Sequence, residues 1–329
     1  MSVGGVLSFT TVLQAVLPVY FLVGAGMVLR RAKMLTPEVD GGMLRLVIHF
    51  LYPCLILDKV LTNELVRVPS VVGWGVGVGF GIIMIGYTFS WLVSRVLGMK
   101  RGSGSRSFTL SGGIQNFGYT AIPVLMALFV SEASDDRVLG ILFVHSLGVE
   151  IAIWVVGVML LTGKFLQSPR ALLNGPIVAI VLGLAGAYSG AWRFFESEGG
   201  PLVGVTIRQA MSWLGGCAFP MALILIGATI HDLFGKEKID WKVALGAVFV
   251  RNGVMALVIL ALAKYLPVIP ELKQVLVVQA SMPAAVTPIL ITRIYGGQPQ
   301  VAMQVIIATS VVALVTMPFV VAWGMAWVF

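Results

Sequence analysis

Ten long apolar segments follow one another along this chain, and the connections between them are short. They lie near residues 7–29, 42–61, 70–97, 108–130, 138–161, 174–192, 205–230, 241–264, 272–294 and 300–328. A helix of about 20 apolar residues crosses the hydrocarbon core of a bilayer with every backbone polar group bonded inside the helix. The pattern therefore predicts an all-α polytopic membrane protein with ten transmembrane helices, spans 1 to 10.

The composition excludes most soluble classes. Only 11% of the 329 residues are charged, whereas soluble domains carry about 25%. The net charge of +8 does not indicate nucleic-acid binding, because the Lys and Arg residues stand in short runs between apolar segments. Three histidines and the cysteines Cys54 and Cys217 show no metal-ligand spacing, so we expect neither a metal centre nor a cofactor. We have no functional account of the two cysteines.

Basic residues in the connections predict the orientation of the chain in the membrane. Loops after odd-numbered spans carry 13 of them: Arg30, Arg31, Lys33, Arg95, Lys100, Arg101, Arg106, Lys164, Arg170, Lys236, Lys238, Lys242 and Arg293. Loops after even-numbered spans carry 7: Lys59, Arg67, Arg137, Arg193, Arg208, Lys264 and Lys273. The excess places the odd loops in the cytoplasm and both termini on the non-cytoplasmic side. We interpret Arg30, Arg31 and Lys33 as solvated cytoplasmic charges.

An internal repeat relates the two halves of the chain. Four features recur in order at offsets of 158, 167, 165 and 164 residues: Pro18 with Pro176, Pro53 with Pro220, Pro123 with Pro288, and His145-Ser146 with Thr309-Ser310. Each half holds five spans, and an odd number inverts the second half relative to the first. We predict two inverted five-helix repeats, residues 1–168 and 169–329, an organisation typical of secondary transporters.

Spans 4 and 9 carry polar and helix-breaking residues at their centres. Proline removes a backbone donor and clashes with a preceding carbonyl, and such breaks survive in a bilayer only where they face protein or water. Broken helices at matching positions of two inverted halves indicate a binding site near the bilayer midplane. Their N-termini suit a carboxylate, and freed carbonyls suit a cation. The alternative interpretation is that these residues only kink the helices.

The candidate site follows from these two spans. The helix breaks are assigned to Pro123, Pro283 and Pro288. The candidate substrate-binding residues are Gln115, Asn116, Gly118, Tyr119, Ser281, Met282, Pro283 and Thr287.

Ionisable residues inside spans are expensive in hydrocarbon and are candidates for energy coupling. Glu150 in span 5 is the deepest, with His145 nearby, and Arg251 interrupts span 8. The alternative for Glu150 and Arg251 is a structural ion pair. His49 in span 2 shares a helical face with Arg45 and is a further candidate. The glycine run at 73–81 is interpreted as a helix-packing face.

Several ordered motifs resemble the auxin efflux carrier family. They are VGAGMVLRRAKMLTPEV (23–39), LVIHFLYPCLIL (46–57), NFGYTAIP (116–123), LLNGPIVAIVLGL (172–184), FPMALILIGATI (219–230), SMPAAVTPILITRIYGG (281–297) and TMPFVVAW (316–323). The resemblance implies the fold of bile acid:sodium symporters. Spans 1, 2, 6 and 7 would form a scaffold and homodimer interface, and spans 3–5 and 8–10 a transport domain that moves as an elevator.

The resemblance also implies the substrates and the compartment. Family substrates are small organic anions, including auxin in plants and malate-type acids in bacteria, and the short connections fit bacterial members of the inner membrane. Asn116 matches the family amide in span 4. Ala284 departs from the polar residue that plant carriers place after the first proline of span 9, which shifts polar contacts to Ser281, Thr287 or Gln279.

The sequence thus predicts a secondary transporter of small organic anions, embedded in membrane lipid, and not an enzyme. Coupling to Na⁺, coupling to H⁺ and transport without a coupling ion all stay open. The alternatives are a sodium-coupled symporter of bile-acid-like anions with the same fold, and an intramembrane enzyme or receptor.

Overall fold

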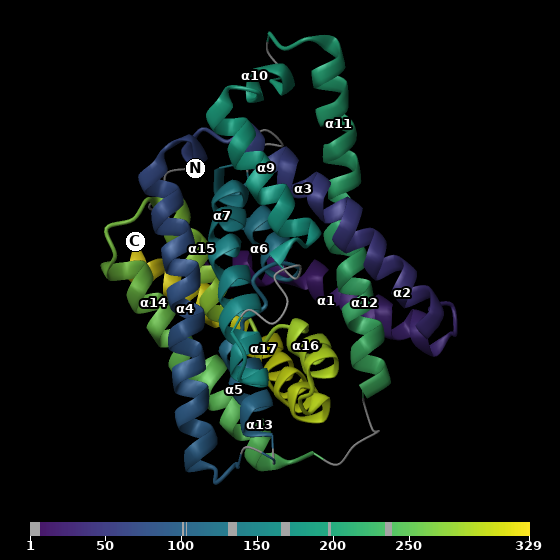
Figure 1. Cartoon of the computed structure of the whole chain (residues 1–329), viewed down its shortest axis with the longest axis vertical. Coiled ribbons are helices and arrows are strands. Elements are labelled where there is room, and N and C mark those ends of the chain that lie inside the picture. Colours follow the sequence, from purple (N-terminus) through teal and green to yellow (C-terminus); the bar gives the residue numbers. More distant parts are fainter. Residues whose placement is uncertain are drawn as a thin grey trace.

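The computed structural model describes residues 7–100, 102, 104–130, 137–165, 172–196, 199–233 and 239–329 (Figure 1). Within these ranges the chain is helical, and extended segments pair only at one isolated antiparallel bridge. The helices of the first half are α1 (Phe9–Arg31), α2 (Pro37–Leu46), η1 (Val47–Leu51), α3 (Tyr52–Leu61), η2 (Leu65–Arg67), α4 (Pro69–Val96), α5 (Ser105–Gly113), α6 (Ala121–Phe129), α7 (Arg137–Ile151), η4 (Ala152–Gly157) and α8 (Val158–Thr162). Those of the second half are α9 (Gly175–Ser189), α10 (Trp192–Phe195), α11 (Leu202–Gly216), α12 (Ala218–Leu233), α13 (Trp241–Val248), η6 (Phe249–Val254), α14 (Met255–Tyr265), α15 (Pro270–Ser281), α16 (Thr287–Tyr295) and α17 (Pro299–Val328). The predicted all-α membrane class is confirmed.

Six helical stretches in the described ranges are long and apolar enough to cross a membrane. They are Phe9–Arg31, Pro69–Val96, Arg137–Thr162, Leu202–Asp232, Trp241–Tyr265 and Pro299–Val328, which correspond to predicted spans 1, 3, 5, 7, 8 and 10. The other four predicted spans are not among them. Span 6 is the 15-residue α9, and spans 4 and 9 are each divided into two short helices. Span 2 runs through α2, η1 and α3, and it carries charged residues near both ends.

Side-chain caps begin three of the helices. Oγ of Ser8 accepts from the backbone N–H of Thr11 over 3.1 Å at the start of α1. Asn174 starts α9 in the same way, and Asp240 starts α13. The first N–H groups of a helix have no partner within it, so an oxygen side chain at this position stabilises the start. These residue types therefore fix where the helices begin.

Glycines set the closest helix contacts. The backbone of α7 lies directly against Gly75 and Gly79 of α4, where a Cβ atom would meet Val144 and the carbonyl of His145. Gly73, Gly77 and Gly81 have nothing within 4 Å of a Cβ position. The predicted packing role is confirmed for one face of this glycine run, because small residues let helices approach closely.

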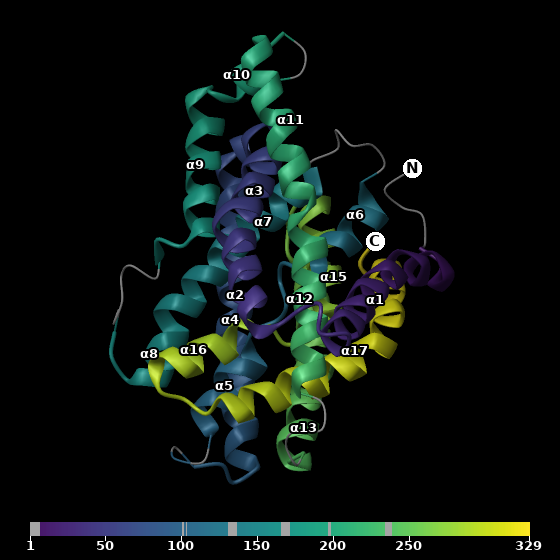
Figure 2. The ribbon, with the colours of Figure 1, turned by 90° about the vertical axis from the view of Figure 1, so that its right-hand side faces the viewer.

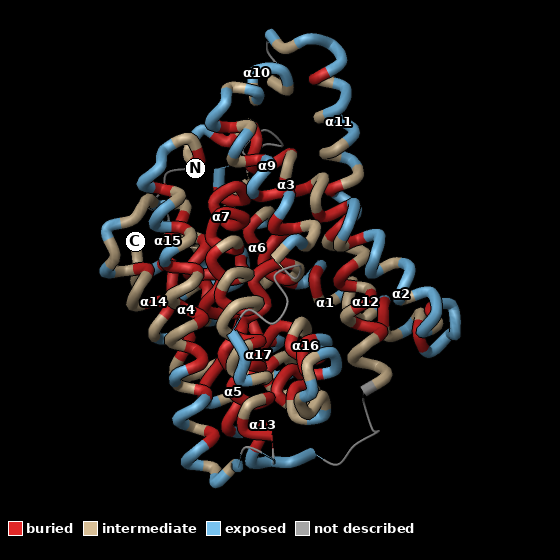
Figure 3. Tube along the Cα trace, viewed as in Figure 1, coloured by how far each residue is buried: buried red, intermediate tan, exposed pale blue. Residues whose placement is uncertain are grey.

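The helices of spans 1, 2, 6 and 7 form a row. Figure 2 shows α9, α3, α12 and α1 following one another, and each contacts the next. The buried residues gather on α5, α7, α15 and parts of α17, whereas α2 and α10 have no buried residue (Figure 3). Large apolar side chains such as Phe21 and Trp213 are exposed on the outer surface. A lipid environment accepts such a surface, and water does not.

Connections predicted to share a side of the membrane contact one another. On the predicted cytoplasmic side, Arg30 pairs with Asp232 and Nη1 of Arg106 donates to the Leu161 carbonyl over 2.8 Å. On the other side, Nδ2 of Asn63 donates to the Arg137 carbonyl over 3.1 Å. Each of these contacts joins segments that the basic-residue count assigns to the same side. The further basic residues Arg101, Arg170, Lys236 and Lys238 of this count lie outside the described residues.

Candidate functional site

Two helices are interrupted deep inside the protein. Residues 114–120 separate α5 from α6, and residues 282–286 separate α15 from α16. In the second break, Pro283 has no N–H to continue a helix, and a residue before proline avoids helical geometry. Met282 accordingly has an extended backbone with ψ of 140°. Pro123 and Pro288 are the third and second residues of α6 and α16, where a missing N–H costs little.

The two breaks are joined to each other. Gln115 and Ala284 form the antiparallel bridge. The N–H of Asn116 donates to the Pro283 carbonyl over 2.8 Å, and the N–H of Ala285 donates to the Ile114 carbonyl over 2.9 Å. In a bilayer the polar groups freed by a helix break need partners, and here each break provides them for the other.

Side chains complete the junction. Nε2 of Gln279 donates to the Phe117 carbonyl over 3.0 Å, which ties α15 to the first break. The hydroxyl of Thr309 on α17 accepts from the N–H of Ala284 over 3.1 Å. Both side chains are fully buried. The geometry of the breaks thus depends on contacts from both halves of the chain.

A cavity of about 230 Å³ lies against the junction. Its walls come from α1, α12, α16, α17 and the two breaks. The lining residues are Val19, Tyr20, Val23, Met27, Asn116, Thr120, Ile226, Thr229, Ile230, Pro283, Ala284, Val286, Ile289, Ile306, Ile307, Ser310, Val311, Ala313, Leu314 and Met317. The lining is largely apolar, with a few amide and hydroxyl groups, which is the usual character of a small-molecule site.

Asn116 is the candidate residue that combines the junction with the cavity. Its Nδ2 donates to Oγ1 of Thr120 over 2.8 Å, and its Oδ1 faces the backbone N–H of Thr120 at 3.5 Å. Both side chains are buried and line the cavity. The amide is thereby held at the start of α6, where the free N–H groups of a helix N-terminus carry partial positive charge.

The other span 4 candidates face other parts of the protein. Gln115 is fully buried, is not a cavity residue, and its amide atoms have no hydrogen-bond partner among the described residues. A Cβ at Gly118 would meet the hydroxyl of Tyr52. The ring of Tyr119 lies 5.3 Å from that of Tyr52, measured between centroids.

The span 9 candidates also face different parts of the protein. Pro283 lines the cavity. The Ser281 hydroxyl donates to the Val278 carbonyl of its own helix over 2.8 Å, and Met282 is buried, with its carbonyl directed at Arg251. Thr287 is the half-buried first residue of α16 and is not a cavity residue.

The charged candidates do not form a cluster. Oε2 of Glu150 accepts from Nε1 of Trp154 over 2.7 Å and from Nδ2 of Asn174 over 3.4 Å. Arg251 instead donates to the carbonyls of Met282 and Gln279. The alternative ion pair between Glu150 and Arg251 is therefore not formed. His145 is fully buried, and within the described part of the chain neither of its ring nitrogens has a hydrogen-bond partner.

The polar face predicted in span 2 points outward. His49 and Arg45 are both exposed, and Nε of Arg45 donates to the Gly41 carbonyl one turn earlier. A shared helical face does not tell which neighbour that face meets, so the sequence could not distinguish this arrangement from an inward one.

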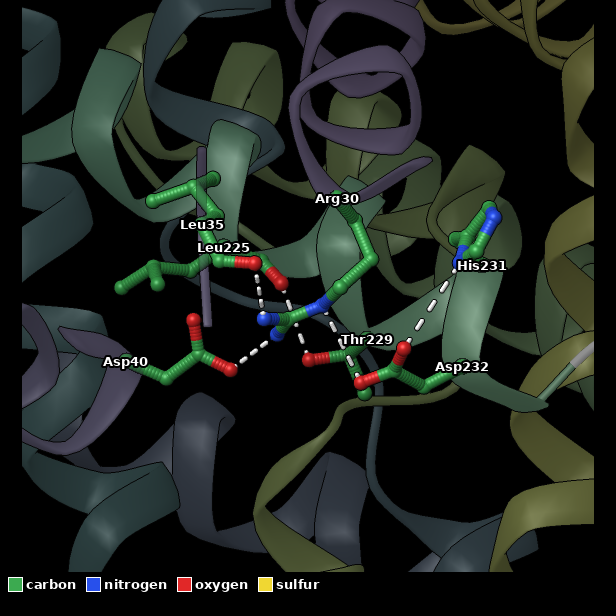
Figure 4. Close-up of polar contacts among 7 residues, drawn as sticks. All are labelled: Arg30, Leu35, Asp40, Leu225, Thr229, His231 and Asp232. Carbon is green, nitrogen blue, oxygen red and sulfur yellow. Dashed lines mark hydrogen bonds and ion pairs between the residues drawn. The ribbon is translucent and has the colours of Figure 1, made fainter. Parts of the chain in front are cut away.

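Arg30 is a correction to the sequence interpretation. It is buried rather than solvated, and it lies between α1, α2 and α12 (Figure 4). Its guanidinium pairs with Asp40, lies 3.1 Å from Oδ2 of Asp232 and donates to the Leu35 carbonyl over 2.6 Å. Arg31, the next residue, is exposed as predicted. The positive-inside count places both residues on one side of the membrane but cannot tell which one turns inward.

Several cavity residues escaped the sequence reasoning. Tyr20 on α1, Thr229 on α12 and Ser310 on α17 carry hydroxyl groups within largely apolar helices, and Ser310 was predicted only as part of a repeat marker. Their local sequence does not mark them as cavity residues, because a hydroxyl in a membrane helix often bonds its own backbone. Thr229 does so, donating to the Leu225 carbonyl over 2.9 Å (Figure 4).

Comparison with known proteins supplies the family. A family model described as membrane transport protein matches residues 11–170 and 166–321, almost the whole chain. A comparison with curated proteins gave no match. The long apolar helices, the paired helix breaks and this match agree. The chain belongs to the auxin efflux carrier-type family of membrane transport proteins.

Proposed function

We propose that this membrane transporter is a secondary carrier of small organic anions, such as malate-like or auxin-like carboxylates. It binds them at the junction of the two broken helices and moves them by an elevator-type alternating-access motion. Family membership carries the transport class, since the family consists of transporters and not enzymes. The substrate, the motion and the energy coupling are our proposal.

The cavity at the junction is the observation that carries the substrate class. It contains Asn116 and Thr120 from the first break and Pro283 and Ala284 from the second. None of the described residues that line it carries a charge. The adjoining N-termini of α6 and α16 provide partial positive charge for a carboxylate, and the apolar walls suit the carbon skeleton.

The contact pattern supports ten spans in two inverted repeats. Within the described helices, the pair formed by spans 1 and 7 has its counterpart in spans 6 and 2. Contacts of span 3 with spans 4 and 5 are mirrored by those of span 8 with spans 9 and 10. Span 4 meets span 10 as span 9 meets span 5. Each relation exchanges the halves, as a pseudo-two-fold axis requires, and the odd number of spans in each half would place that axis in the membrane plane.

The position of the cavity supports the elevator. It lies between α1 and α12, which belong to the proposed scaffold of spans 1, 2, 6 and 7, and the breaks and α17 of the proposed transport domain. Sliding one group past the other would expose the same site to each side in turn.

We further propose a homodimer in the bacterial inner membrane with both termini outside the cytoplasm. The scaffold segments η1 and α11 carry exposed apolar side chains, among them Phe50, Leu202 and Trp213, on which a second copy can pack.

Uptake into proteoliposomes tests the function. Labelled dicarboxylates, monocarboxylates and indole acids are offered with and without a sodium gradient, a proton gradient and an imposed potential. We expect saturable anion uptake that is lost in Asn116→Ala and kept in Ser281→Ala, whose hydroxyl bonds its own helix. Uptake that requires Na⁺ and favours bile-acid-like anions would support the symporter alternative. No flux of any acid contradicts the proposed substrate class, and unchanged flux in Asn116→Ala contradicts the site.

A further inference from the structure

Arg251 is a buried charge that contacts the second break. It is fully buried, and it lies in η6, a π-helical turn between α13 and α14. Single π-helical turns inside α-helices recur at functional sites because they redirect side chains. Here the turn directs a guanidinium to the end of α15.

The guanidinium binds two carbonyls at the end of α15, of which that of Gln279 also accepts from the backbone N–H of Met282 over 3.2 Å. Nε donates to the Met282 carbonyl over 3.1 Å, and Nη2 donates to the Gln279 carbonyl over 3.2 Å. The last carbonyls of a helix lack donors within the helix and carry partial negative charge. A cation is therefore favourable at this place, and these are the oxygens that a metal cation would otherwise use.

No carboxylate of the described part of the chain pairs with Arg251, and its Nη1 has no hydrogen-bond partner. A buried charge without a counter-ion is costly, so a purely structural arginine at this position is expected to have an acidic partner. The uncompensated charge lies next to the peptide of Met282 and Pro283, and Pro283 lines the cavity.

The equivalent place in the first half holds no charge. The repeat offset of 165 residues brings Arg251 onto Gly86 of α4. The backbone of Gly113, the last residue of α5, packs directly against Gly86 and leaves no room for a side chain. The cation is thus a feature of one break only.

We propose that Arg251 is the resident cation of the transport site. It holds the second break in the shape that pairs with the first, and its charge behind that break favours an anion in the cavity, so no metal cation has to be bound with the substrate. This inference rests on the proposed function. Arg251 is a positioning residue in this scheme, since the substrate contacts are made by the cavity residues.

The test compares the native protein with Arg251→Ala and Arg251→Lys in media containing Na⁺ or choline. Arg45→Ala is the matched control, because Arg45 is also an arginine within a span but is exposed. We expect native uptake to be equal in both media. Loss of two charge-assisted hydrogen bonds in Arg251→Ala should lower uptake at least about a hundredfold, since each such bond contributes about a factor of ten or more. Arg251→Lys should keep part of the uptake, because its ammonium keeps the charge but lacks the planar guanidinium that donates to both carbonyls.

Chemical rescue separates a resident cation from a merely structural side chain. Guanidinium at low millimolar concentration, or Na⁺, should restore part of the uptake of Arg251→Ala and should not affect Arg45→Ala. A second readout needs no transport: the same guanidinium should raise the melting temperature of purified Arg251→Ala and not that of the native protein.

The outcomes are distinct. Native uptake that requires Na⁺, or Arg251→Ala uptake equal to native in choline, overturns the resident cation while leaving the proposed function standing. If Arg251→Ala does not fold, uptake by the native protein in choline still tests the proposal, because a requirement for Na⁺ overturns it. Absence of uptake by the native protein in every medium overturns the proposed function. The melting experiment then tests separately whether Arg251 occupies a cation site.

Discussion

The backbone N–H of Asn116 and the carbonyl of Pro283 are joined by a 2.8 Å hydrogen bond, although the two residues belong to different halves of the chain. Each residue lies in a helix break, and each also lines the cavity. The bond therefore couples the shape of the two binding segments. A substitution that shifts one break should also alter the binding residues of the other break, because backbone hydrogen bonds between the two breaks hold both in place.

The first prediction concerns Thr120, which orients Asn116. Its Oγ1 accepts from Nδ2 of Asn116 over 2.8 Å. Thr120→Val removes this acceptor and keeps the side-chain shape. A lost neutral hydrogen bond of about 1 kcal/mol should raise the KM for anion uptake about fivefold, with less effect on the maximal rate. Thr120→Ser is the control and should stay near native. Equal KM values for Thr120→Val and the native protein would show that the amide is held by other contacts.

The sequence predicted the region of this site better than its individual residues. Prolines and glycines in spans 4 and 9 marked the breaks, because the chemistry of a missing N–H is local. The orientation of a side chain next to a break is not local. Gln115 and Asn116 are adjacent amides, yet only Asn116 lines the cavity, and this depends on a backbone bond to a residue 167 positions away. Thr309 was predicted only as a repeat marker and bonds Ala284.

The second prediction uses two glycines of α4. Gly79→Ala places a methyl group against the carbonyl of His145, a backbone atom that cannot move aside. Overpacking of this kind costs about 1–3 kcal/mol, so the melting temperature of the purified protein should fall. Gly77→Ala is the matched control. It meets nothing within 4 Å, and alanine is a better helix former by about 0.5–1 kcal/mol, so its stability should be unchanged or slightly higher. Similar losses in both variants would contradict close packing of α4 on α7.

The third prediction concerns the ion pairs of Arg30. Arg30→Gln leaves the carboxylates of Asp40 and Asp232 without their cation in a partly buried place. Removing one member of a buried pair typically costs about 3–5 kcal/mol, and partial exposure of the two acids reduces this to about 2 kcal/mol. Arg31→Gln, one residue further and exposed, should have no measurable effect. Thermal unfolding in detergent distinguishes the two variants, and an Arg30→Gln protein as stable as the native one would show that these ion pairs do not hold α1 against α2 and α12.

Span prediction succeeded where helices are regular and fell short where they are not. Apolar length identifies α1, α4 and α17 directly, because each runs unbroken through more than 20 residues. The same measure merges α5 with α6 and α15 with α16, since hydropathy does not register where backbone hydrogen bonds stop. The 15-residue α9 is shorter than the predicted segment because Gly190 ends it with a left-handed φ of 83°.

The last prediction tests the elevator at a contact between the two proposed domains. The hydroxyl of Tyr20 on α1 donates to the carbonyl of Leu314 on α17 over 2.8 Å, and both residues line the cavity. If the transport domain slides along the scaffold, this contact must separate in every cycle. A covalent link between positions 20 and 314 should then stop uptake, whereas a link within one domain should not.

The experiment replaces Cys54 and Cys217 with Ala, since both are free and Cys217 is exposed. Tyr20→Cys and Leu314→Cys are then combined and joined by a reducible bifunctional thiol reagent with a short spacer. Uptake should be lost on linking and should return on reduction. The control links Tyr265→Cys to Trp327→Cys, whose rings lie 6.2 Å apart between α14 and α17 inside the proposed transport domain and outside the cavity. Uptake that survives the link between 20 and 314 would exclude a sliding motion at this contact, because α1 and α17 would then stay together through the transport cycle.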